Sequence, residues 1–173
     1  KELNLLIKAS NNLLYFSEDF EIDTSFTNGW SYAGTGTLVP NNVVSPQGIR
    51  KADSITSMAA GDIFQQLVSG VGNTDTVTLT VYARSVTQSG TLRLHITQGA
   101  NNYTADTPLT DGGWQRCSFT KVLLAGMDTI QFEKIGAGTP TIDLWGAQLE
   151  VGASATDYGY TFHVLKPYYL FLR

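Results

Sequence analysis

Residues 76–84 read TVTLTVYAR, and apolar and polar side chains alternate along the whole run. Because successive side chains of a β-strand point to opposite faces, this period of two predicts a strand with one face in a core and the other in water. The outward set includes Tyr82 and Arg84 among threonines. The set predicted to face the core is Val77, Leu79, Val81 and Ala83.

The same pattern recurs along the chain. Residues 91–97 repeat it, with Arg93 and His95 on the outward face. Glycine, proline and asparagine clusters separate the segments, and no amphipathic helical period of useful length occurs. About nine or ten short strands with turns between them predict an all-β fold, an antiparallel β-sandwich of jelly-roll type. The other expected strands lie around Trp30 and Tyr32, at 35–39, 52–55 and 63–68, around Tyr103, and at 114–122, 129–135 and 141–149.

The composition narrows the class of protein. A chain of 173 residues fits one domain, and only 15% of its residues are charged, below the ~25% that is usual for soluble domains. A neutral surface rich in Thr, Ser, Asn, Gln and Gly is typical of extracellular and virion β-proteins. The net charge of -4 without a basic cluster argues against a nucleic-acid partner. No run approaches the ~20 apolar residues of a membrane span, so no membrane insertion is expected.

Residues that could support catalysis or hold a cofactor do not form a recognisable pattern. The lone Cys117 excludes an intramolecular disulfide and is predicted to be a buried core residue within its strand. His95 and His163 lack the spacing of metal ligands. We interpret the acidic residues between positions 18 and 21 as a solvated turn. The sequence therefore predicts a non-enzymatic protein without a cofactor.

Exposed aromatic rings beside polar side chains suggest a glycan site, because the apolar face of a sugar stacks on an aromatic ring while polar neighbours bind its hydroxyls. Two alternatives remain open: Trp30 packs in the core, and the outward residues face a neighbouring subunit. We interpret Trp114 and Trp145 as core or sheet-packing residues. The predicted glycan-binding residues are Trp30, Tyr32, Tyr82, Arg84, Arg93, His95 and Tyr103.

The two ends of the chain are more apolar than the rest. We expect an N-terminal arm over residues 1–11, the jelly roll over 12–157, and an apolar tail over 158–173 that docks on a partner. Such ends favour self-association, with a trimer expected, and contact with other proteins of an assembly. The predicted assembly contacts are Leu3, Leu5, Leu6 and Ile7 in the arm and Phe162, Tyr168, Tyr169 and Phe171 in the tail.

Two stretches carry a resemblance to a known family: NLLYFSEDF at residues 12–20 and LWGAQLEVG at 144–152. Together they resemble the carbohydrate-binding-module-like jelly rolls of bacteriophage tail fibres, head fibres and other virion surface proteins. The central runs at 81–84 and 113–116 also resemble this family. The resemblance implies a virion structural protein on the particle surface, in an extracellular setting, as a head-decoration, head-fibre or tail-fibre subunit with host-surface glycan as the expected ligand.

A second resemblance gives the alternative function. The amino-terminal motif is also similar to polysaccharide-binding jelly rolls attached to bacterial glycosidases, which implies a carbohydrate-binding module of a polysaccharide-active enzyme. In those modules an acidic residue after the first strand and an aspartate in the last strand hold a structural calcium ion. The matching positions here are Glu21 and Asp143. The calcium site is thus an expectation from resemblance alone.

Overall fold

The computed structural model describes most of the predicted jelly roll. The predicted arm at 1–11 lies outside the described residues, as does the predicted tail except for Tyr158. The assembly contacts placed in these two segments therefore stay predictions. The described residues are 12–14, 20, 29–68, 71–72, 74–124, 126 and 129–158.

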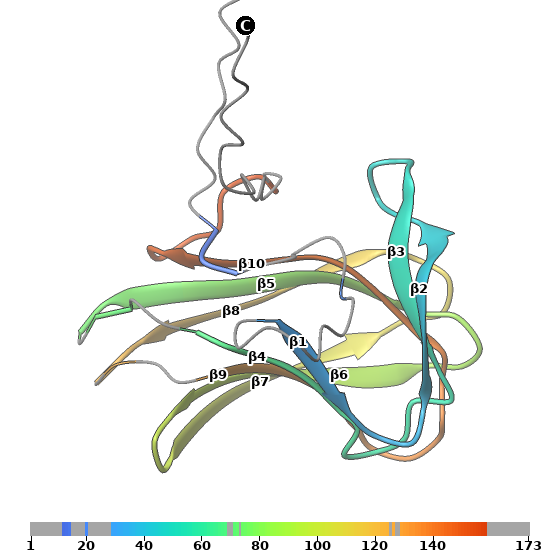
Figure 1. Ribbon diagram of the computed structural model, residues 1–173, viewed down its shortest axis with the longest axis horizontal. Helices are drawn as coiled ribbons and strands as arrows, with labels where there is room; N and C mark the ends of the chain where they lie inside the picture. The colour runs from blue at the N-terminus through green and yellow to red at the C-terminus, as the bar shows by residue number, and fades with distance from the viewer. Residues whose placement is uncertain are drawn as a thin grey trace, which may run out of the picture.

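Two five-stranded sheets face each other as the two layers of a sandwich (Figure 1). Sheet A has the order β1-β4-β9-β6-β7 and sheet B the order β2-β3-β10-β5-β8, and all pairings between these strands are antiparallel. The predicted all-β antiparallel sandwich is thereby confirmed. The strands are β1 (Trp30–Ala33), β2 (Thr37–Val44), β3 (Arg50–Thr56), β4 (Ile63–Leu67), β5 (Thr76–Ser85), β6 (Gly90–Gln98), β7 (Asn101–Leu109), β8 (Gln115–Val122), β9 (Thr129–Ile135) and β10 (Ile142–Val151).

The core lies between the sheets and is built from the inward face of each central strand. The four apolar residues of β5 predicted to face inward are fully buried. Trp30 is also buried, at 1% exposure, with its ring centroid 4.7 Å from that of Phe20 and 5.6 Å from that of Phe132. The prediction of Trp30 as a glycan-binding residue is therefore wrong, because its ring is enclosed by other core aromatics.

Cys117 lies on the inward face of β8 at 1% exposure. Burial raises the pKa of its thiol to about 11, so the group stays protonated and unreactive at neutral pH. The prediction of a buried core cysteine is confirmed.

Strand β2 runs further than the sequence indicated. The expected strand over 35–39 ended at Pro40, whereas β2 continues through this proline to Val44. β2 is an edge strand that pairs only with β3, and an edge position tolerates a residue without an N–H donor. The register shifts between Val39 and Val43, and Asn41 has a φ of 51°, so this part of the strand is irregular.

The end of sheet B bends at β2 and β3, which rise out of the plane of β10, β5 and β8 (Figure 1). Strand β3 pairs with β10 only from Ile142 to Leu144. Beyond that point the N-terminal segment takes its place, since Leu13 N donates to Leu149 O at 2.9 Å and Asn12 Nδ2 donates to Ala147 O at 2.9 Å. Two different parts of the chain therefore lie along this edge of β10, β3 at Ile142–Leu144 and residues 12–13 at Ala147 and Leu149.

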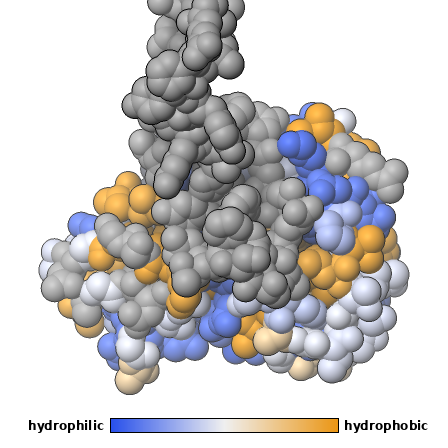
Figure 2. All heavy atoms as spheres, viewed as in Figure 1, coloured by the Kyte–Doolittle hydropathy of each residue, from blue (hydrophilic) through white to orange (hydrophobic). Residues whose placement is uncertain are grey.

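Large hydrophobic side chains that remain exposed lie mainly at strand ends. Leu67, Val122 and Val151 end β4, β8 and β10 and are 60%, 54% and 57% exposed. Figure 2 shows hydrophobic and hydrophilic residues interspersed over the described surface in that view. Among the described residues, no helix has the length and apolar character needed to span a membrane.

Candidate functional site

The structure divides the predicted glycan-binding residues between the two outer faces of the sandwich. Tyr82 and Arg84 lie on β5 and point away from the core on the outer face of sheet B. Arg93 and His95 lie on β6 and point outward from sheet A. The two pairs therefore belong to opposite sides of the molecule and cannot contact one ligand together.

The outer face of sheet A is a ladder of paired polar groups. Arg93 donates to both carboxylate oxygens of Asp106 at 2.6 and 2.9 Å, and this hydrogen bond lowers the pKa of Asp106. His95 is only 5% exposed because Glu133 lies 2.8 Å from its Nε2 and Asn102 lies 3.1 Å from its Nδ1. None of the paired positions that share this face in β4, β9, β6 and β7 carries an outward aromatic ring. The side chains of Arg93 and His95 therefore already have partners on this face.

Tyr32 and Tyr103 lie apart from both pairs. The Tyr32 hydroxyl donates to Asp62 at 2.8 Å, and burial raises the pKa of Tyr32 well above its ordinary value. Tyr103 lies on the edge strand β7, where the ammonium nitrogen of Lys121 is 4.2 Å from its ring centroid. Both tyrosines therefore have structural partners of their own.

A first row of contacts on the outer face of sheet B joins β3, β10 and β5 and extends to Trp114, just before β8. Ser54 Oγ donates to Asp143 Oδ1 at 2.5 Å, and Arg84 Nε donates to Asp143 Oδ2 at 2.7 Å. The Arg84 guanidinium lies 4.8 Å from the ring centroid of Trp114, which precedes β8. Trp114 Nε1 in turn donates to the carbonyl of Val44 at the end of β2, at 3.3 Å. Because Val44 ends β2, this bond joins the bent end of the β2–β3 pair to the residue that precedes β8.

The calcium prediction is not tested. Glu21 lies outside the described residues, and both carboxylate oxygens of Asp143 are engaged by Ser54 and Arg84. In the part of the chain that the structure describes, no three His, Cys, Asp or Glu side chains gather as a metal site would require.

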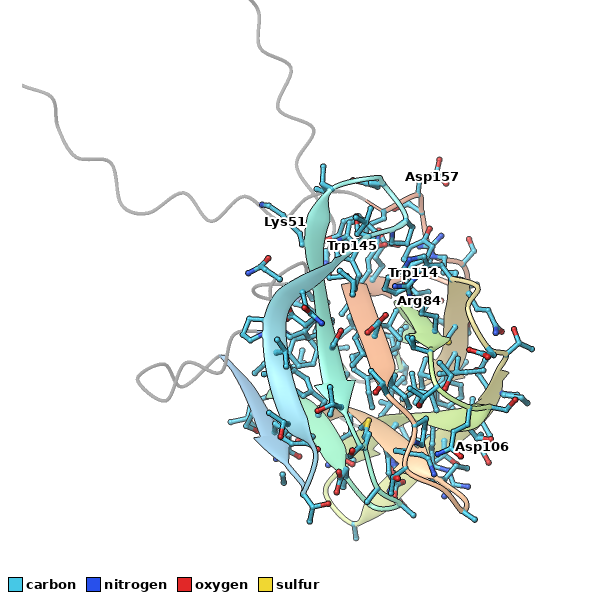
Figure 3. The ribbon with its side chains drawn as sticks, turned by 90° about the vertical axis from the view of Figure 1, so that its right-hand side faces the viewer. Lys51, Arg84, Asp106, Trp114, Trp145 and Asp157 are labelled. Atoms are coloured by element: carbon cyan, nitrogen blue, oxygen red, sulfur yellow. The ribbon has the colours of Figure 1, made fainter. Side chains whose placement is uncertain are left out.

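A second row on this face is aromatic. The ring centroid of Trp145 lies 5.5 Å from that of Tyr82 and 4.5 Å from that of Tyr158, and the Arg116 guanidinium lies 5.6 Å from the Tyr82 ring. Trp145 is fully buried, yet it lies outside the core cluster between the sheets. Figure 3 shows Trp145, Trp114 and Arg84 gathered at the same end of the molecule. Tyr82, Arg84 and Trp114 keep part of their surface exposed.

A bulge in β10 brings these residues outward. The register between β10 and β5 shifts between Trp145 and Gln148, and Gly146 has a φ of 63°, which favours glycine. Without the shift, strict alternation would turn Gln148 inward. With it, Trp145 is opposite Tyr82 and Gln148 is opposite Thr80, and both point outward. The alternating pattern does not predict Trp114, Trp145 or Arg116 as site residues. The LWG run at residues 144–146 is the sequence feature that marks the bulge, and so the outward position of Trp145.

No family model matches the chain, and no curated protein matches its sequence. Solved structures with the same fold do match, at low identity. A xylan-binding domain of Xyn10C from Paenibacillus barcinonensis is 18% identical with a TM-score of 0.63, over 86% of this chain and 99% of that one. The module TmCBM61, solved with β-1,4-galactotriose, is 13% identical with a TM-score of 0.62, over 82% of this chain and 99% of that one.

Tailspike protein 4 of bacteriophage CBA120 is also similar, at 14% identity and a TM-score of 0.58. The match covers 81% of this chain but only 21% of the tailspike chain. Identities this low show the fold alone. The chain therefore has the β-sandwich jelly-roll fold of carbohydrate-binding modules.

Proposed function

We propose that the chain is a non-catalytic glycan-binding jelly roll whose ligand lies on the outer face of sheet B. One observation carries this proposal: Tyr82, Arg84 and Trp114 lie together on that face and remain partly exposed. The apolar face of a sugar stacks on such rings, and arginine beside them binds hydroxyl oxygens. On the other face, Arg93, His95 and Gln131 already pair with Asp106, Glu133 and Gln65.

The rings of this site are held in place before a ligand arrives. Trp114 is fixed by its hydrogen bond to Val44 and by the guanidinium of Arg84. Arg84 is itself held by the buried carboxylate of Asp143. A preorganised site loses less conformational entropy on binding, which favours affinity for a flexible oligosaccharide.

We further propose that this module belongs to a virion surface, as a head-decoration, head-fibre or tail-fibre subunit that self-associates, with a trimer expected. The fold similarity to a bacteriophage tailspike supports this setting, as does the apolar composition of the two chain ends. The competing function is a carbohydrate-binding module of a polysaccharide-active enzyme, which the similarity to the xylan-binding domain supports. A trimer in light scattering favours the virion role, whereas a monomer retained by xylan favours the enzyme module.

The glycan proposal is tested with the wild-type chain on a printed glycan array, followed by electrophoresis in gels that contain xylan and by titration with β-1,4-galactotriose. We expect saturable binding to at least one glycan of the array. Absence of binding to every glycan, with a cooperative unfolding transition showing that the protein is folded, would remove the proposal.

A further inference from the structure

Residues 152–158, here called the strap, follow β10 and fold back over the outer face of sheet B. Thr156 ties the strap down: its N and Oγ1 donate to the two carboxylate oxygens of Glu150, both at 2.7 Å. Arg116 Nη2 donates to the carbonyl of Thr156 at 2.6 Å, and Gln148 Nε2 donates to its Oγ1 at 3.2 Å. At its start, Gly152 also exchanges hydrogen bonds with Thr76 and Thr78 of β5, so Thr156 is the second polar anchor of the strap on the sheet.

Tyr158, at the end of the strap, lies over Trp145. Their ring centroids are 4.5 Å apart, and a Cβ added at Gly146 would lie 3.2 Å from the tyrosine ring. The glycine of the bulge thus makes room for Tyr158. This contact helps to explain why a tryptophan on an outer face has no exposed surface.

Two buried donors beside this contact have no hydrogen-bond partner: Trp145 Nε1 and Arg116 Nε. They flank Tyr82, which pairs with Trp145 on one side and with Arg116 on the other. A buried donor left unpaired is unfavourable, so a ligand that brings acceptor oxygens to these two atoms would recover free energy on binding.

Between its two ends, Gly152 and Tyr158, the strap buries little apolar surface. Its residues from Ala153 to Asp157 are exposed or half-buried, and Thr156 supplies most of its hydrogen bonds to the sheet. Segments with few buried apolar contacts open locally at small free energies. Figure 3 shows Asp157 at the surface, near the end of the molecule that holds Trp145.

We propose that the strap covers a second aromatic subsite built on Trp145, and that a sugar residue displaces Tyr158 from it. The sugar stacks on the indole ring, and its oxygens accept hydrogen bonds from Trp145 Nε1 and Arg116 Nε. The inference rests on the proposed glycan function, which it extends from the exposed rings of Tyr82 and Trp114 to the covered ring.

The binding test compares three variants with wild type against the best glycan of the array. Tyr158→Ala removes the cover, Thr156→Val removes the hydroxyl of the tie, and Asp157→Ala changes an exposed strap residue as the matched control. We expect the first two to bind about tenfold more tightly, because the competent state is populated without displacing Tyr158, and the control to bind as wild type does.

Each outcome decides the matter. Binding by Tyr158→Ala where wild type binds weakly or not at all supports the covered subsite. Equal or weaker binding by Tyr158→Ala, with wild type still binding, overturns the subsite and leaves the glycan function intact. Absence of binding by every folded variant overturns both.

Fluorescence gives a readout without glycan. In a Trp114→Phe background Trp30 and Trp145 are the two tryptophans left to emit, and Trp30 is enclosed in the core. Adding Tyr158→Ala should increase quenching by acrylamide, whereas adding Asp157→Ala should not. Unchanged quenching would show that Tyr158 does not cover Trp145 and would overturn the inference.

Discussion

The two outer faces of the sandwich differ in how many of their charged, hydrogen-bonding and aromatic side chains remain available to a ligand. On sheet A, Arg93 pairs with Asp106 and His95 with Glu133, so charge and hydrogen-bonding capacity are used within the face. On sheet B, the aromatic and arginine side chains that stay partly exposed include Tyr82, Arg84, Trp114 and Arg116, and two buried donors lack partners. A face that still has unused binding capacity is the better candidate for a ligand site.

The difference arises from backbone geometry. Both faces are produced by the same alternation of inward and outward residues. Only sheet B combines a bulge at Gly146 with the bend of β2 and β3 that brings Val44 within reach of Trp114. The same fold therefore gives one ordinary polar surface and one surface with clustered rings.

The largest expected effect comes from the core between the faces. Trp30→Ala should lower the free energy of unfolding by about 4 kcal/mol, because it removes a ring packed among Phe20, Phe64 and Phe132. Urea denaturation measures this change. The contradicting result is a Trp30→Ala protein that has nearly wild-type stability and does not bind glycan. It would mean that Trp30 contacts the ligand and is not a core residue.

The next effect tests the row of contacts on sheet B that joins Ser54, Asp143 and Arg84. Asp143→Ala should destabilise the fold by about 3 kcal/mol, because it leaves Ser54 and Arg84 without their shared acceptor at a position that is 1% exposed. It should also weaken glycan binding, since Arg84 loses its support. Chemical denaturation and glycan titration check the two parts, and wild-type values in both would contradict the role assigned to this row.

A third effect tests whether Tyr32 and Asp62 are structural. Burial would raise the pKa of Asp62, but hydrogen bonds from Ala59, Tyr32, Thr35 and Gly36 outweigh it and lower the pKa. A group whose pKa is lower in the folded state contributes stability above its ordinary value of about 3.9, and this is lost as the pH falls through the folded-state pKa.

Asp62→Asn should therefore cost about 2 kcal/mol near neutral pH and much less in strong acid. Melting temperatures of both proteins between pH 2 and 7 measure this convergence. Two curves that stay parallel throughout would show that the carboxylate charge of Asp62 is not the source of the stability.

The smallest effect is expected on sheet A. Asp106 is 43% exposed and its partner Arg93 is 33% exposed, so water screens the pair. Asp106→Ala should change the free energy of unfolding by less than about 1 kcal/mol. A loss as large as that of Asp143→Ala would mean that the two faces do not differ as described.

The sandwich could be predicted from the sequence because the alternation of apolar and polar residues in a strand is a local pattern. Alternation over residues 76–84 and 91–97 identified β5 and β6 and the direction of their side chains. The site depends on long-range geometry. Strand order decides which strands lie in the same sheet and so present their outward residues on the same face. The outward position of Gln148 depends on a register shift. Arg93 and His95 lie on sheet A, whereas Tyr82 and Arg84 lie on sheet B, and the alternation within each strand could not show this separation.

The covered ring of Trp145 was beyond prediction for the same reason. Its burial involves Tyr158, thirteen residues later in the sequence, folding back through contacts of Thr156 with Glu150 and Arg116. No local pattern encodes such a return.

The most direct test of the central claim is a side-by-side titration of Trp114→Ala and Arg93→Ala with the same array-selected glycan. The two variants alter one partly exposed residue on each outer face. We expect Trp114→Ala to weaken binding about tenfold or more, a loss of roughly 1.4 kcal/mol, and Arg93→Ala to bind as wild type does. Weakened binding by Arg93→Ala with full binding by Trp114→Ala would place the site on sheet A and contradict this account.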